Sequence, residues 1–194
     1  QRPVVTYEIL PPREKDGTLN SYAEKISSLL SQTHIDAINI PEVREEEGRG
    51  KRPVVNSSRA EPRHFGRLLQ DMVGVESIVN RVVVHDELKN QIKWFKETHE
   101  KYEIENMIIV GGESSKIKYI GPTVNQILEL VAFKYNNNGG DILCGGITLP
   151  TRSDESKNLI RKSGNGAEFF TTQVLCDSEN IIKMMNKYQE RCDA

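Results

Sequence analysis

The sequence has little that would suit a secreted, metal-binding or membrane-spanning protein. Its three cysteines are far apart and form no Cys-x-x-Cys pair, and its four histidines form no His-x-x-x-His pattern. We therefore expect neither disulfides nor a zinc site, and a reducing, cytoplasmic environment. The apolar stretch around Val131 is interrupted by Glu129 and Lys134. It falls far short of the about 20 apolar residues that a membrane helix needs.

The chain also lacks an excess of charge of one sign. Its 26 Lys and Arg residues nearly balance 28 Asp and Glu residues, which gives a net charge of -2. Proteins that attract nucleic acid or anionic membranes carry a strong positive field, so we expect a small-molecule partner instead. Hydrophobic residues make up 37% of the 194 residues, enough for the core of one domain.

Six short segments rich in β-branched residues alternate with helical patterns. Continuous apolar runs such as 82–84 and 107–110 are typical of strands buried on both faces of a parallel sheet. The expected strands are residues 4–10, 35–40, 80–85, 106–110, 141–147 and 168–172. The alternation predicts βαβ units, in either an open doubly wound sheet or a (β/α)8 barrel. Counting units favours the open sheet, because the barrel has eight. The charged segment 42–52 is expected to be a solvated loop.

Both architectures gather active-site residues at the carboxyl ends of their strands. Glu8 lies inside the first expected strand among aliphatic neighbours, where an ionised carboxylate is costly to bury. Burial favours the neutral form that a general acid needs, although an ion pair with Arg13 or Arg152 would explain the residue equally well. Segment 111–115 (Gly-Gly-Glu-Ser-Ser) follows the fourth strand, where its glycines could admit a ligand or simply form a tight turn.

Two further groups follow the last expected strands. Asn158, Arg161 and Lys162 share one side of a helix, at spacings of i, i+3 and i+4. Arg and Lys in this arrangement can hold a phosphate or pyrophosphate, but a solvated helix face has the same pattern. Gln173 ends the sixth strand, where its amide could contact the edge of a heterocycle or hold a loop.

Taken together, five segments resemble the flavin-dependent methylenetetrahydrofolate reductase family. They are residues 7–13 (YEILPPR), 36–40 (DAINI), 111–115 (GGESS), 159–162 (LIRK) and 166–173 (GAEFFTTQ). The resemblance implies a (β/α)8 TIM-type barrel in place of the open sheet. Only about six β/α units are visible, so we expect residues 1–194 to form a single barrel domain that is incomplete at its C-terminus. Open barrel edges would favour a homo-oligomer or a partner chain.

The resemblance also implies roles for individual residues. Glu8 takes the place of the family's general acid at the substrate, and Gln173 matches a glutamine that contacts the pterin. Glu113 replaces an aspartate near the flavin and the folate, and is implied to be catalytic as well. The cofactor-binding residues implied for FAD are Gly112, Glu113, Glu155, Asn158, Arg161 and Lys162. Of these, Asn158, Arg161 and Lys162 would hold the ribityl-phosphate region.

The implied activity is an oxidoreductase reaction of one-carbon metabolism that leads towards methionine. FAD would pass hydride from NADH or NADPH to 5,10-methylenetetrahydrofolate and yield 5-methyltetrahydrofolate, while Glu8 protonates the folate to open its five-membered ring. Two alternatives stay open. The chain could be a non-catalytic or partner-dependent relative that binds flavin or folate, or a reductase of another C1–pterin carrier.

Overall fold

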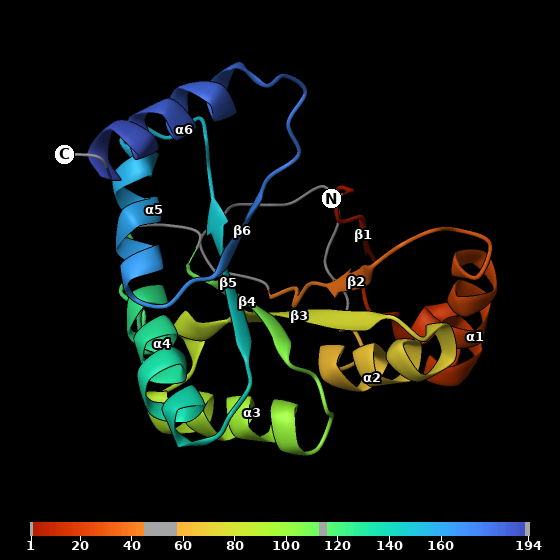
Figure 1. Cartoon of the computed structure of the whole chain (residues 1–194). Coiled ribbons are helices and arrows are strands. Elements are labelled where there is room, and N and C mark those ends of the chain that lie inside the picture. Colours follow the sequence, from red (N-terminus) through yellow and green to blue (C-terminus); the bar gives the residue numbers. More distant parts are fainter. Residues whose placement is uncertain (1, 45–57, 113–115, 193–194) are drawn as a thin grey trace.

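Six parallel strands follow one another across a single curved sheet in the computed structural model of the chain, which describes residues 2–44, 58–112 and 116–192 (Figure 1). The strands are β1 (Thr6–Glu8), β2 (Ala37–Ile40), β3 (Glu76–Val82), β4 (Asn106–Val110), β5 (Leu143–Thr148) and β6 (Phe169–Thr172). Each strand pairs with its neighbour in the sequence, in the order β1-β2-β3-β4-β5-β6. This order lacks the reversal that defines a doubly wound sheet.

Helices cover the outer side of this sheet (Figure 1). They are α1 (Leu19–Leu30), α2 (Pro62–Val73), α3 (Leu88–Glu100), α4 (Val124–Leu130), α5 (Glu155–Gly164) and α6 (Glu179–Cys192). Local sequence sets the ends of α2. The Glu61 carboxylate accepts a hydrogen bond from the His64 N–H, Pro62 occupies the first turn, and Gly74 ends the helix at a φ of 75°. Among the described residues, no helix is both long and apolar enough to cross a membrane.

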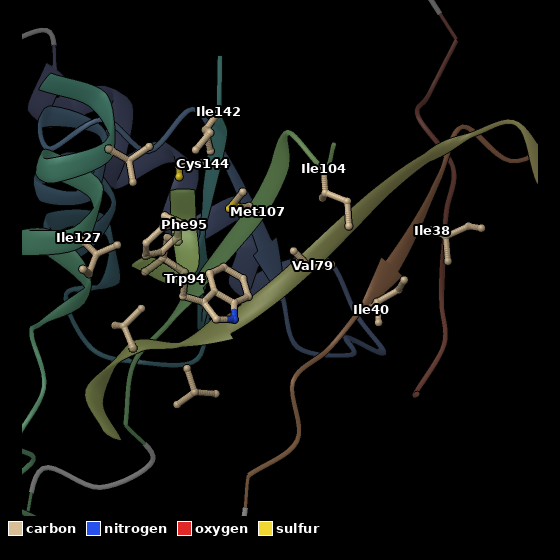
Figure 2. Packing of buried hydrophobic residues seen from close by; sticks show 14 of the residues in the cluster. Ile38, Ile40, Val79, Trp94, Phe95, Ile104, Met107, Ile127, Ile142 and Cys144 are labelled. Atoms are coloured by element: carbon tan, nitrogen blue, oxygen red, sulfur yellow. The ribbon is translucent and has the colours of Figure 1, made fainter. Parts of the chain in front are cut away.

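The hydrophobic core lies between the sheet and these helices (Figure 2). Alternate residues of each strand point outward into it, and Ile38, Val79 and Met107 are each fully buried there. Helix α2 approaches the sheet closely at Gly66, where an added Cβ would lie 3.0 Å from Cδ1 of Ile40. The opposite, concave face of the sheet is the one left for ligands.

The expectation of a (β/α)8 barrel is wrong for this chain. The described strands form a half-barrel in which β1 pairs only with β2, and β6 only with β5. Six strands do not bring the first and last strand of this sheet together, so both remain edges (Figure 1). The concave face therefore stays open along one side.

The first residues of the segment expected as a solvated loop after β2 belong to a partly buried ion-pair network. Residues 45–52 of that segment lie outside the described residues. Glu42, however, accepts hydrogen bonds from the Val82 N–H at 2.7 Å and from Nη1 of Arg81 at 2.9 Å. Arg81 and Arg44 also both donate to Asp86. This network fastens the chain after β2 to the carboxyl end of β3.

Candidate functional site

A cleft of about 450 Å³ opens at the carboxyl ends of β4 and β5. Its lining residues are Val110, Gly111, Gly112, Thr123, Val124, Asn125, Ile147, Leu149, Arg152, Arg161 and Lys162. All charged side chains among these lining residues are cationic, and they come from the β5–α5 connection and from α5. The cleft is therefore suited to an anionic group.

A buried carboxylate organises the wall of this cleft. Glu155, the first residue of α5, is 2% exposed. It accepts hydrogen bonds from the Leu149 N–H at 3.1 Å, from Oγ1 of Thr148 at 3.2 Å and from Nδ2 of Asn158 at 2.8 Å. The side chain thus ties the end of β5 to the first turn of α5. The same carboxylate lies 3.5 Å from Nη1 of Arg152, so it contacts one of the cations that line the cleft.

The ionised form of Glu155 is favoured despite its burial. Burial alone would raise the pKa of this carboxyl, but the hydrogen bonds from Asn158 and from the Leu149 N–H lower it. The positive charges of Lys162 and Arg152 act in the same direction, and the net pKa of Glu155 lies below its ordinary value. A negative charge is thereby fixed behind the cationic wall.

The residues that the sequence predicts on one side of α5 do lie close together in the structure. Oδ1 of Asn158 accepts a hydrogen bond from Nη2 of Arg161 at 3.0 Å, so Glu155, Asn158 and Arg161 form one chain of contacts. Nζ of Lys162 donates to the Ile147 carbonyl at the end of β5. Burial lowers the pKa of the Lys162 ammonium, an effect that the Glu155 carboxylate opposes. An anion in the cleft would stabilise the charged form.

The loop after β4 lies on the other wall of the cleft. A Cβ at Gly112 would lie 2.2 Å from the ring of Tyr119, so only glycine lets this ring cover the loop. The Tyr119 ring also meets His85 edge-on, with centroids 5.5 Å apart. Glu113, the expected partner of Gly112 in the flavin site, lies outside the described residues.

Glu8 is exposed, contrary to the burial that its aliphatic neighbours predict. The reason is that β1 is an edge strand, which pairs only with β2 among the strands that the structure describes. Nδ2 of Asn39 donates to the Glu8 carboxylate at 2.8 Å. Among the described residues, Glu8 forms no ion pair, so neither Arg13 nor Arg152 is its partner. Gln173 lies just beyond β6 and is also exposed, at the opposite edge of the sheet.

The concave face carries polar acceptors that sequence reasoning missed. A cavity of about 570 Å³ lies on this face towards the amino ends of the strands, where Thr6, Asn39 and Ile78 are among its lining residues. Neither Glu8 nor Asn80 lines this cavity. Glu8 and Asn80 lie two residues after Thr6 and Ile78 in their strands, so they face the same side. Oδ1 of Asn39 and Oδ1 of Asn80 are both buried without a hydrogen-bond partner. Asparagine is rare inside strands. The presence of Asn39 and Asn80 within two apolar runs was therefore the feature of the sequence that could have indicated a binding role.

No family model matches the chain, and no curated protein matches it by sequence. Solved structures do share its architecture. An uncharacterized protein from Clostridium thermocellum, which binds two copies of 5-methyl-5,6,7,8-tetrahydrofolic acid, has a TM-score of 0.73 at 17% identity. That match covers 98% of this chain and 61% of the Clostridium protein. This chain therefore spans less than two thirds of that protein's length.

Two further solved structures are similar at lower scores. A putative phosphonomutase from Burkholderia cenocepacia J2315 has a TM-score of 0.50 at 10% identity, over 98% of this chain and 68% of that one. The 2,3-dimethylmalate lyase of the PEP mutase/isocitrate lyase superfamily has a TM-score of 0.53 at 10% identity, over 94% and 62%. The shared feature is the fold. This chain is an open half-barrel of TIM type.

Proposed function

We propose that this chain binds a reduced folate on the concave face of its sheet. The observation that carries the proposal is the row of acceptors formed by Glu8, Asn39 and Asn80 on three adjacent strands. A buried acceptor without a donor costs about 1–3 kcal/mol. A pterin presents several N–H donors along one edge, and these would satisfy the two amide oxygens.

The comparison with solved structures supports the same ligand class. The Clostridium thermocellum protein of this fold binds 5-methyltetrahydrofolic acid, and its TM-score to this chain is 0.73. The segments that resemble methylenetetrahydrofolate reductases point independently to a folate-type C1 carrier. Both lines favour a pterin-bearing small molecule over a polyanion.

The finer proposal is that the chain is an FAD-dependent reductase of 5,10-methylenetetrahydrofolate. The cleft at β4 and β5 fits a phosphate-bearing cofactor, because the three cations Arg152, Arg161 and Lys162 line it. Arg161 and Lys162 would hold the phosphate region there, and Asn158 would position Arg161 through the hydrogen bond that its Oδ1 accepts at 3.0 Å. When bound, FAD would supply hydride transfer from NADH or NADPH to the folate.

Glu8 would supply the proton of this reaction. Its carboxyl would protonate the ring nitrogen that departs when the five-membered ring of the folate opens, and the added hydride completes the methyl group. The Asn39 amide holds the carboxylate in place at 2.8 Å. A pterin lying over β1 would exclude bulk water from the Glu8 carboxyl.

A titration of the purified chain with 5-methyltetrahydrofolate, followed by calorimetry, tests the binding proposal. We expect saturable binding that Asn39→Ala and Asn80→Ala each weaken by about tenfold. The matched control is Asn90→Ala, because this exposed asparagine lies on α3, on the other side of the sheet from the concave face. Absent binding, or equal losses in all three variants, would contradict the proposal.

The visible spectrum of the purified chain with FAD tests the proposed reductase activity. Bound flavin that is bleached by NADH or NADPH and restored by methylenetetrahydrofolate would support the reductase. The second candidate function is a flavin- or folate-binding module without turnover. It is favoured by the positions of Glu8 and Gln173, which are exposed on opposite edges of the open sheet. Bound FAD without nicotinamide oxidation would support this module instead.

A further inference from the structure

Two arginines meet at a small pocket outside the cleft and the acceptor row. The pocket has a volume of about 250 Å³ and lies just after β1, where the chain runs beside residues 58–60. Its lining residues are Pro12, Arg13, Glu14, Gly17, Leu19, Ser58, Arg59 and Ala60. An antiparallel bridge pairs Arg13 with Arg59, and the Ala60 N–H donates to the Pro12 carbonyl at 2.8 Å.

This bridge places two like charges side by side. Directly paired residues of an antiparallel bridge have their Cβ atoms about 4.5–5.5 Å apart on one face, and like charges in such a pair are destabilising. Nη1 of Arg59 donates to the Pro11 carbonyl at 2.7 Å. Within the described part of the chain, neither arginine forms an ion pair, so the two positive charges have no fixed counter-charge.

Each of the two guanidinium groups also has one N–H donor that is shielded from water. The Nε atoms of Arg13 and Arg59 are buried and have no hydrogen-bond partner. Cationic groups that are partly removed from water are costly unless a charge compensates them. The terminal nitrogens of a guanidinium form a fork that matches the oxygens of a carboxylate or a phosphate. An oxyanion between the two side chains would relieve their repulsion.

We propose that Arg13 and Arg59 form an oxyanion site that takes a carboxylate or phosphate group of a small-molecule ligand. Glu14 lines the same pocket and would oppose an anion, which limits the affinity. The site does not depend on the proposed folate or flavin chemistry. It would be a third region that contacts a ligand, besides the acceptor row and the cleft. It lies at the β1–β2 end of the sheet, away from the cations of α5.

The test is a titration of the whole chain with inorganic phosphate, observed through the Nε–H signals of its arginines by NMR. We expect the signals of Arg13 and Arg59 to shift saturably. Arg13→Gln should lower the phosphate affinity by about tenfold or more. Lys15→Gln removes the same charge from a neighbouring exposed residue outside the pocket, and should change the affinity by less than about twofold.

Two further variants guard against effects on folding. Arg13→Lys keeps the charge but not the fork, and should retain part of the affinity. Glu14→Gln should raise the affinity, because it removes a negative charge from the pocket wall. Shifts that do not saturate, or equal losses in the Arg13→Gln and Lys15→Gln variants, would show only diffuse attraction and overturn the site.

Folate and nicotinamide ligands then show whether the site takes a carboxylate or a phosphate group. Comparing 5-methyltetrahydrofolate with its analogue that lacks the glutamate tests a carboxylate, and comparing NADPH with NADH tests a phosphate. A loss of affinity in Arg13→Gln that disappears with the tail-free analogue assigns a folate carboxylate. A loss confined to NADPH assigns its additional phosphate. Because inorganic phosphate alone tests the site, failure of the proposed folate function would leave its result unchanged.

Discussion

Nδ2 of Asn39 lies 2.8 Å from the carboxylate of Glu8, across the outermost strand pair of the sheet. This hydrogen bond uses the amide as a donor and leaves its oxygen, which is buried, without a partner. The pair therefore offers a ligand both a carboxylate and a free acceptor at one edge of the concave face. Glu8 itself is open to water, which makes its chemistry dependent on what covers it.

The first prediction separates the role of Glu8 in chemistry from a role in binding. Glu8→Gln should leave the reduction of bound flavin by NADH or NADPH nearly unchanged and slow the reduction of methylenetetrahydrofolate by about 100-fold or more. Stopped-flow absorbance measures the two half-reactions separately. Glu24→Gln is the control, since this exposed carboxylate lies on α1, outside the concave face of the sheet. If Glu8→Gln changes the rates of the two half-reactions by the same factor, or changes neither, the general-acid assignment is wrong.

The second prediction concerns the cationic wall of the cleft. Arg161→Gln should weaken FAD binding by about 10- to 100-fold, because it removes a charge-assisted hydrogen bond worth about 1.5–3 kcal/mol. Lys157→Gln removes one charge from the same helix, but this lysine is exposed and pairs with Asp154 at 3.3 Å. Its effect should be small. Fluorescence quenching of added FAD gives both affinities, and equal losses would show that the helix attracts FAD only by its net charge.

The central strands of the sheet could be predicted from the sequence because their residues are buried on both faces. Met107, Ile108 and Ile109 are buried on both faces, as their continuous apolar run predicts. The third strand begins and ends earlier than predicted. Its carboxyl end is fixed by Glu42, which accepts a hydrogen bond from the Val82 N–H and lies 40 residues away in the sequence. A local pattern does not contain such a contact.

The site was predictable only where it lies on one helix. Asn158 and Arg161 meet because their spacing on α5 dictates it. The burial of Glu8 was predicted wrongly, because it depends on whether another strand lies beside β1. The unpartnered oxygens of Asn39 and Asn80 depend on the register of two strands. Register and edges are properties of the whole sheet, and no single segment encodes them.

The third prediction is a pH dependence that Glu155 causes. Its folded pKa lies below the ordinary value of 4.5, so the group stabilises the fold above that pH. This contribution is lost as the pH falls through the folded pKa. The wild type should therefore lose more stability between pH 7 and acidic pH than Glu155→Gln does. The variant should already be less stable at pH 7, by about 1–3 kcal/mol. Urea unfolding across this pH range measures both effects, and parallel pH profiles would contradict the prediction.

The fourth prediction tests the close approach of α2 to the sheet. A Cβ at Gly66 would lie 3.0 Å from Cδ1 of Ile40 and 3.3 Å from Cδ1 of Ile104, both of which are fully buried. Because these side chains are packed on all sides, Gly66→Ala should destabilise the protein by about 1–3 kcal/mol despite the better helix propensity of alanine. Gly164→Ala is the matched control on α5, where an added Cβ meets nothing within 4 Å. Alanine there should leave the stability unchanged or raise it slightly. Thermal unfolding compares the two, and a Gly66→Ala variant as stable as Gly164→Ala would mean that α2 can move away from the sheet without cost.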